Sequence, residues 1–356
     1  MIPIFKPYMP ENITSGIEDI LYSSKLSFGD KGKEFEEKLA SYIRNDKVLT
    51  ISSYNQALLI VLSTLGLKVG DEIIASPVSC LASNQPFVVK GLKVIWADIN
   101  PLSGTLSVDD VRSRITSKTK AIFHNHYCGY LGEIEEMNTL GKEFGIPVVD
   151  DCIEAFGSEL NGRKTGNLGT DITVFSFQTV RLPNTIEGGA LVFNNQEMFE
   201  KAKIIRDYGI ERANFRDSLN EINPDCDIKL EGYGALMGEI SSMIGIKQLE
   251  GLDSLIKKQR ANAVIWDKRI QQEKDIESLR PIENTVPNRW VYGVLAKNKI
   301  KTIKNYRKEG FYATSVHTNN NIYSVFENKT NLSGVNDFMN HFVAFPCGWW
   351  FNLENK

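Results

Sequence analysis

The chain has 356 residues, of which 42% are hydrophobic and 24% are charged, and its formal net charge at pH 7 is −3. This composition is typical of a globular protein, and the length favours one large α/β domain plus a smaller one. The weak negative charge gives no electrostatic reason to expect nucleic acid or an anionic membrane as a partner. The five scattered cysteines, an odd number without a Cys-x-x-Cys pair, argue against a disulfide framework and favour a reducing cytoplasm.

Short β-rich runs alternate with helical patterns over the first 200 residues. This alternation predicts a mostly parallel, seven-stranded sheet covered by helices. In such sheets ligands bind beyond the carboxyl ends of the strands. We expect strands at residues 48–52, 72–76, 93–97, 121–125, 146–150, 172–176 and 189–193, and helices at 56–65, 82–90, 108–115, 134–144 and 198–208.

The remaining chain shows different patterns. Residues 215–229 are polar and rich in turn residues, which predicts an extended surface or interface loop, and residues 234–260 have helical periodicity. A strand at 290–296, a helix at 301–309 and a strand at 312–317 then suit a small α+β domain. We therefore expect a large domain at 1–255 and a small C-terminal domain at 256–356. Neither a signal peptide nor an apolar membrane span is expected.

Several motifs resemble, in order, those of the DegT/DnrJ/EryC1/StrS family, whose members are mostly pyridoxal-phosphate (PLP) sugar aminotransferases. The resemblance implies the fold-type I architecture of PLP-dependent transferases and a homodimer with sites at the subunit interface. It also implies PLP or its amino form, pyridoxamine phosphate (PMP), as cofactor, and a role in nucleotide-sugar metabolism that feeds surface polysaccharide. The motifs lie at residues 34–42, 70–74, 115–122, 126–129, 150–157, 174–189 and 245–249.

Arg181 stands where this family places the lysine that holds PLP as a Schiff base. A Schiff base needs an amine that can lose its proton and attack a carbonyl, and a guanidinium does neither at neutral pH. No lysine occurs from Thr165 through Glu200. The sequence therefore predicts that ordinary transamination is absent.

Two further positions match cofactor contacts of the family. Asp151 matches the carboxylate that pairs with the pyridine nitrogen, which lets the ring act as an electron sink. Ser176 matches a phosphate contact, and we add Gln178 as a neighbouring candidate. The alternatives are that Asp151 only caps the next turn and that Ser176 is a buried hydroxyl bonded to backbone.

Other family positions are changed. Ser53-Tyr-Asn-Gln-Ala-Leu58 replaces Ser-Gly-Thr-x-Ala-Leu, so Tyr54 puts a ring where the backbone approaches the phosphate, while Asn55 can still donate hydrogen bonds. Cys80 stands in place of the aromatic residue that stacks on the pyridine. Glu154 replaces Gln or His near the phenolic oxygen. These changes indicate a rebuilt site in a retained fold.

Our first hypothesis is an enzyme on nucleotide-linked sugars that does not use a lysine. Arg181 would be a fixed cation for phosphate or carboxylate, with His126 or Glu154 as the general acid or base. The alternative for Arg181 is a salt bridge to Asp151 or Glu154 that fills the space of the lost cofactor. Two other hypotheses remain open: a non-catalytic sugar-nucleotide sensor or accessory subunit, and an enzyme that holds PLP or PMP noncovalently.

A metal site is a further alternative. His124 and His126 lie two residues apart on a predicted strand and share a face, followed by Cys128 in the same phase, and Asp150 or Asp151 could complete a ligand set. The simpler interpretation places one histidine in the core and the other at the site, so we assign no metal. His317 and His341 have no visible companions in the sequence.

Overall fold

A seven-stranded sheet organises the large domain of the computed structural model, which describes residues 1–11, 13–327 and 329–355. The strand order is β1-β9-β8-β5-β4-β2-β3, and only β9 runs against its neighbours. The predicted fold class is therefore confirmed. The strands are β1 (Val48–Ile51), β2 (Glu72–Ala75), β3 (Lys93–Trp96), β4 (Thr119–Asn125), β5 (Val148–Asp151), β8 (Ile172–Ser176) and β9 (Gly189–Phe193).

Helices cover both faces of this sheet, because every residue of its central strands except Lys120 is buried and these strands need apolar partners on each side. Two separate clusters of buried side chains mark the two faces. One face packs against α3 (Tyr54–Thr64), α4 (Leu81–Val89) and α7 (Gln196–Arg206); the other packs against α2 (Asp30–Ile43), α5 (Val108–Arg114), α6 (Ile134–Phe144) and α8 (Glu239–Ile270).

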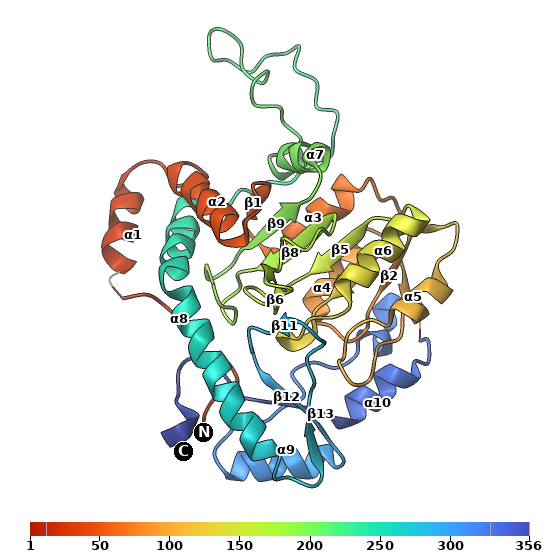
Figure 1. Ribbon diagram of the computed structural model, residues 1–356. Helices are drawn as coiled ribbons and strands as arrows, with labels where there is room; N and C mark the ends of the chain where they lie inside the picture. The colour runs from red at the N-terminus through yellow and green to blue at the C-terminus, as the bar shows by residue number, and fades with distance from the viewer. Residues whose placement is uncertain (12, 328, 356) are drawn as a thin grey trace.

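The C-terminal part forms a smaller layer with its own core around the fully buried Trp266. Helix α8 continues from the large domain into this part, so the expected boundary at residue 255 lies inside a helix (Figure 1). The start of the chain joins the small part, since Ile2 pairs with Phe311. Its elements are β10 (Ile276–Ser278), β12 (Tyr292–Ala296), β13 (Phe342–Phe345), α9 (Lys299–Lys308) and α10 (Ser333–His341).

The smaller elements were harder to predict. The expected strand at 312–317 forms only an isolated bridge between Thr314 and Ala344, and the strand that pairs with β12 is β13. Short strands carry too few residues to show a period. The remaining elements are α1 (Ile13–Tyr22), β6 (Glu159–Leu160), β7 (Arg163–Lys164), β11 (Thr285–Val286), and four 3-10 turns at Tyr127–Gly129, Asn320–Ile322, Ser324–Phe326 and Leu353–Asn355.

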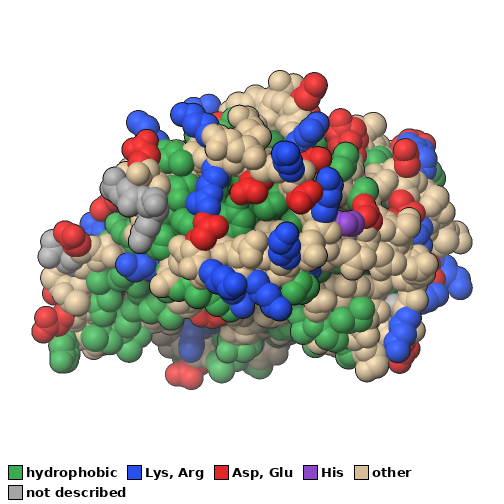
Figure 2. All heavy atoms as spheres, turned by 90° about the horizontal axis from the view of Figure 1, so that it is seen from below, with side chains coloured by type: hydrophobic (Ala, Val, Ile, Leu, Met, Phe, Trp, Pro, Cys, Tyr) green, Lys and Arg blue, Asp and Glu red, His purple; other side chains and the backbone are tan. Residues whose placement is uncertain are grey.

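A long segment without helix or strand follows α7 and leaves the body of the molecule (Figure 1). It contains the predicted extended loop at 215–229, and its apolar side chains Leu219 and Ile222 are 80% and 61% exposed. Elsewhere, charges of both signs are interspersed on the face seen in Figure 2. That face therefore lacks the single-sign field that would attract a polyanion. Among the described residues, no helix is long and apolar enough to cross a membrane.

Candidate functional site

The candidate site lies where the carboxyl ends of β5 and β8 meet the start of α3. Asp151 is the last residue of β5, Ser176 is the last residue of β8, and Tyr54 is the first residue of α3. Ser53 caps this helix, because its side chain accepts a hydrogen bond from the backbone N–H of Gln56. This is the edge at which a parallel sheet places its ligands.

A buried charge network occupies one half of the site. Glu154 accepts a hydrogen bond from the backbone N–H of Cys128 at 2.6 Å, and its Oε1 lies 2.9 Å from His317 Nε2 and 3.4 Å from Arg181 Nη1. Burial alone would raise the pKa of Glu154, but the hydrogen bond from His317, the positive charge of the protonated His317 ring and the charge of Arg181 hold it below its ordinary value. Glu154 is therefore ionised at neutral pH.

Arg181 is held between the large and the small part of the chain. Its guanidinium carbon lies 4.5 Å from the centre of the Trp290 ring, a cation–π distance. The Trp290 ring stacks on Phe5 and donates its N–H to the carbonyl of Val180. Arg181 is only 6% exposed, and it forms the salt bridge to Glu154 that the sequence analysis gave as the alternative, with Asp151 not taking part in it.

Hydroxyl groups occupy the other half of the site. Tyr54 is fully buried, and its hydroxyl lies 2.8 Å from Ser83 Oγ. Burial raises the pKa of Asp151 to about 6, against the opposing effect of hydrogen bonds from the hydroxyls of Ser83 and Tyr54 and from the backbone N–H of Ile153. Asp151 thus faces the phenol of Tyr54 and has no cation among these partners.

The remaining predicted contacts are bonded to the protein itself. Ser176 Oγ accepts from the backbone N–H of Gln178 at 3.3 Å, and the Gln178 amide lies 3.5 Å from Glu187 at the surface. Asn55 donates to the carbonyl of Ala82. Cys80 lies near the charges of Glu154, Arg181 and Asp151, and burial raises the pKa of its thiol.

His126 is not brought to these residues. Both of its ring nitrogens are bonded elsewhere: Nε2 lies 3.1 Å from Asp150 Oδ2, and Nδ1 accepts from the backbone N–H of Gly132. His124 Nδ1 lies 3.0 Å from the other oxygen of Asp150. The three side chains form a fully buried group, here called the histidine cluster. It lies on the face of β5 opposite Asp151, because successive residues of a strand point to opposite faces.

The histidine cluster has the composition of a metal site but unfavourable hydrogen bonding. A neutral imidazole has one N–H, and Nδ1 of His126 accepts the Gly132 hydrogen bond, so its proton lies on Nε2. That nitrogen then donates to Asp150 and offers no lone pair to a metal. Cys128 and Asp151 do not belong to the cluster.

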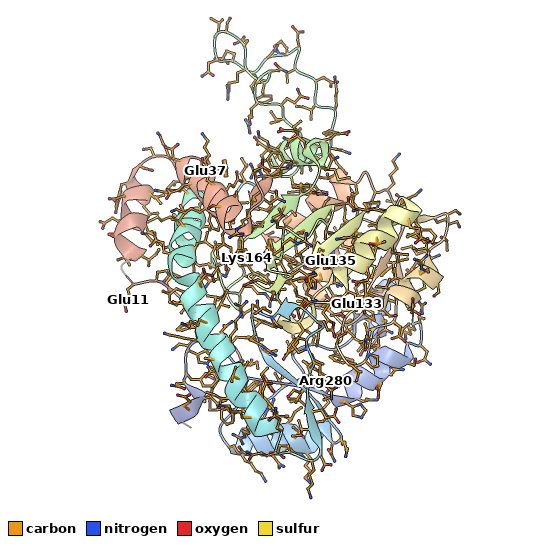
Figure 3. All side chains as sticks on the ribbon, viewed as in Figure 1. Glu11, Glu37, Glu133, Glu135, Lys164 and Arg280 are labelled. Carbon is orange, nitrogen blue, oxygen red and sulfur yellow. The ribbon has the colours of Figure 1, made fainter. Side chains whose placement is uncertain are left out.

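The stretch from Thr165 to Glu200 contains no lysine that could take the place of Arg181. Lys164, immediately before this stretch, contacts an aromatic ring instead. Lys164 comes from β7, and its Nζ lies 3.2 Å from the centre of the Tyr42 ring. Figure 3 shows Lys164 beside the upper part of α8. Tyr42 stacks on Phe156, which contacts Phe175. The Lys164 side chain therefore packs on this group of aromatic rings.

These residues do not fit a lysine-bound pyridoxal phosphate. Arg181 cannot form the Schiff base, and the Tyr54 phenol already faces the Asp151 carboxylate. Glu154 is an anion held by two cationic or donor side chains. In this chain the side chains of the site bond to one another.

Three participants were missed from the sequence. His317 and Trp290 come from the small part and reach Glu154 and Arg181 from more than 100 residues away. Ser83, in the first turn of α4, faces Tyr54. No sequence motif around these residues predicts the contacts. Side chains so far apart in the sequence meet only because the large and the small part of the chain pack together.

Comparison with known proteins gives one consistent result. A family model described as the DegT/DnrJ/EryC1/StrS aminotransferase family matches residues 7–354. The chain is 26% identical to UDP-4-amino-4,6-dideoxy-N-acetyl-beta-L-altrosamine transaminase of Campylobacter jejuni over 345 residues, covering 93% of this chain and 88% of the relative. It is 30% identical to GDP-perosamine synthase of Vibrio cholerae over 271 residues, covering 75% and 70%. The crystal structure of the sugar aminotransferase CalS13 from Micromonospora echinospora superposes with a TM-score of 0.94 at 25% identity, covering 100% and 97%.

Proposed function

The chain belongs to the DegT/DnrJ/EryC1/StrS aminotransferase family, and from this premise we propose that it is an enzyme that acts on a nucleotide-linked sugar without a lysine-bound cofactor. Two relatives are named for UDP-linked and GDP-linked sugars, which supports this class of substrate. The observation that carries the proposal is the pairing of Glu154 with both Arg181 and His317 at the place of the lysine.

His317 is the catalytic residue in this proposal. Its Nε2 faces the ionised Glu154, so Nε2 carries a proton, and in the neutral imidazole the lone pair then lies on Nδ1. The imidazole side chain is 19% exposed, whereas Glu154 and Arg181 are almost fully buried. A histidine oriented by a carboxylate on one nitrogen serves as a general base through the other.

The reaction that this geometry supports is proton transfer at a carbon next to a sugar carbonyl. His317 Nδ1 accepts the proton, and the electron pair of the C–H bond moves into the adjacent carbonyl to give an enolate. The imidazolium returns a proton to the same carbon, so no oxidant or reductant is consumed. Exchange of that hydrogen with solvent, with or without inversion at the carbon, is the expected outcome.

Glu154 and Arg181 are positioning residues. Glu154 fixes the ring of His317 and stabilises the imidazolium that forms during proton transfer. Arg181 keeps Glu154 ionised by its charge and is itself fixed on the Trp290 ring. A guanidinium is suited to this part because it stays charged and stacks on aromatic faces.

We further propose that the protein is a homodimer in the cytoplasm. The exposed apolar side chains of the extended segment, Leu219 and Ile222, support a partner surface there. All five cysteines are free, which is compatible with a reducing compartment.

Solvent exchange tests the proposal directly. We expect the wild-type protein to exchange hydrogen of UDP- or GDP-linked 4-keto sugars in D₂O, followed by proton NMR, and His317→Gln to slow the exchange by about 10²–10⁴-fold. His341→Gln is the matched control, because His341 is exposed on α10 and bonds within its own helix. Equal exchange by wild type and His317→Gln would contradict the assignment of His317.

A binding-only protein is the second candidate, favoured by one observation: the Tyr54 ring is fully buried beside Asp151. In that case the protein would bind the sugar nucleotide, as measured by calorimetry, without any exchange in D₂O. The same pair of measurements therefore separates the enzyme from a sensor or accessory subunit.

A further inference from the structure

The buried environment of Tyr54 is a second feature of the candidate site, separate from the arginine at position 181. Its side chain is fully buried at the start of α3, and its hydroxyl is bonded to Ser83 at 2.8 Å and to Asp151. By the family resemblance described above, glycine is expected at this position and the carboxylate at Asp151 matches the one that pairs with the pyridine nitrogen. In this chain that carboxylate already accepts a hydrogen bond from the phenol of Tyr54.

The phenol of Tyr54 is a flat six-membered ring that presents one hydrogen-bond donor, its O–H, to the buried carboxylate of Asp151. A protonated pyridine would present its N–H to the same carboxylate in the same way. The phenol satisfies part of the hydrogen-bonding capacity of Asp151, so burial of this acid without a cofactor costs less.

The backbone at Tyr54 lies against the sheet and cannot move closer to it to make room for a second ring. A methyl group added at Gly189 on β9 would lie 3.3 Å from the Cα of Tyr54 and 2.7 Å from the carbonyl oxygen of Phe175. The start of α3 thus packs directly on the sheet. Close packing of this kind means that a new ring requires removal of an old one.

We propose that Tyr54 is a built-in occupant of the pyridine position, so that this side chain, independently of Arg181, excludes pyridoxal cofactors from the site. The lysine in this family provides the covalent bond, whereas the space beside Asp151 provides the noncovalent binding. A lysine restored at position 181 would therefore still leave no space for the pyridine ring beside Asp151. This inference rests on the geometry at Asp151 and stays independent of the reaction proposed for His317.

A two-by-two set of variants tests this independence: wild type, Tyr54→Gly, Arg181→Lys and the double variant. Each protein is mixed with PLP or PMP, dialysed, and examined by absorbance with and without borohydride. We expect wild type and Arg181→Lys to retain neither compound. Tyr54→Gly retains both without fixation by borohydride, and the double variant fixes PLP covalently, which peptide mass spectrometry locates at position 181.

Tyr54→Phe is the matched control, because it removes the hydroxyl and keeps the ring. It should exclude the cofactor as wild type does. Fold is checked by circular dichroism and thermal melting, and a cofactor that binds Tyr54→Gly should raise its melting temperature. If Tyr54→Gly does not fold, Arg181→Lys can still overturn the inference, since it leaves Tyr54 in place and should then not fix PLP.

Three results would overturn the inference. The first is covalent fixation of PLP by Arg181→Lys alone, and the second is retention of PMP by the wild-type protein. The third is a folded Tyr54→Gly that retains neither compound. The exchange experiment on nucleotide-linked sugars uses wild-type protein without cofactor, so its failure is distinguishable from a failure here.

Discussion

Asp150 and Asp151 are neighbours at the end of β5, yet they belong to two different buried regions. Asp150 lies in the histidine cluster, between His124 and His126, and also accepts from the thiol of Cys152. Asp151 lies at the candidate site on the opposite face and meets the hydroxyls of Tyr54 and Ser83. The two acids differ by one residue in sequence and by the face of one strand in space.

The difference shows in their protonation. Burial alone would raise the pKa of Asp150, but its hydrogen bonds to His126 and His124 lower it below the ordinary value. Burial raises the pKa of Asp151 to about 6. The histidine cluster therefore stabilises the fold, whereas the ionised Asp151 costs stability. A buried carboxyl with a raised pKa is a candidate functional residue.

The same substitution in the two regions should have opposite effects, and the larger effect is expected in the histidine cluster. Asp150→Asn places an amide N–H₂ against ring N–H groups and should lower the free energy of unfolding by about 3–5 kcal/mol at pH 7.5. Urea unfolding followed by circular dichroism measures this loss. An effect within error of zero would mean that the cluster does not hold the sheet together.

Asp151→Asn should stabilise the protein at pH 8. The wild-type carboxyl has its pKa raised from 3.8 to about 6, which corresponds to a cost of at most about 3 kcal/mol when it is ionised. The stabilising contribution of the raised pKa is complete below pH 4 and is lost as pH rises to about 6. The advantage of Asp151→Asn should therefore shrink between pH 8 and pH 5.

Urea unfolding of wild type and Asp151→Asn across this pH range is the measurement. Asp150→Asn run in parallel serves as the control for a change of charge at the same depth. An advantage of Asp151→Asn that stays constant with pH would show that titration of Asp151 is not its source.

Metal removal should have the smallest effect. Because Gly132 donates to His126 Nδ1, His126 offers a donor to Asp150 and no lone pair to an ion, which leaves His124 Nε2, a buried nitrogen without a hydrogen-bond partner among the described residues, as the imidazole nitrogen open to one. We expect no shift in melting temperature with EDTA or with added zinc. Stoichiometric zinc that survives dialysis, measured by elemental analysis, would contradict this assignment and restore the metal alternative.

The large sheet was predictable because each strand is a run of β-favouring residues between turn residues, as at 72–76 and 121–125. The small part was less so: β10, β11 and β13 are two to four residues long, too short for a period to appear. Within the site, motif positions located Asp151, Glu154 and Arg181. They could not assign His126 and His317, because the partner of each histidine comes from elsewhere in the fold.

The sequence by itself indicated the family, which the family model confirms, and it places a carboxylate at Asp151 and, at position 181, an arginine, whose guanidinium cannot form a Schiff base at neutral pH. Only the tertiary structure decided which histidine lies at the candidate site. His126 bonds Asp150 on the far face of β5, while His317 reaches Glu154 across 163 residues of chain. Contacts over such separations arise when packed layers bring side chains together, and a local pattern of residues carries no record of them.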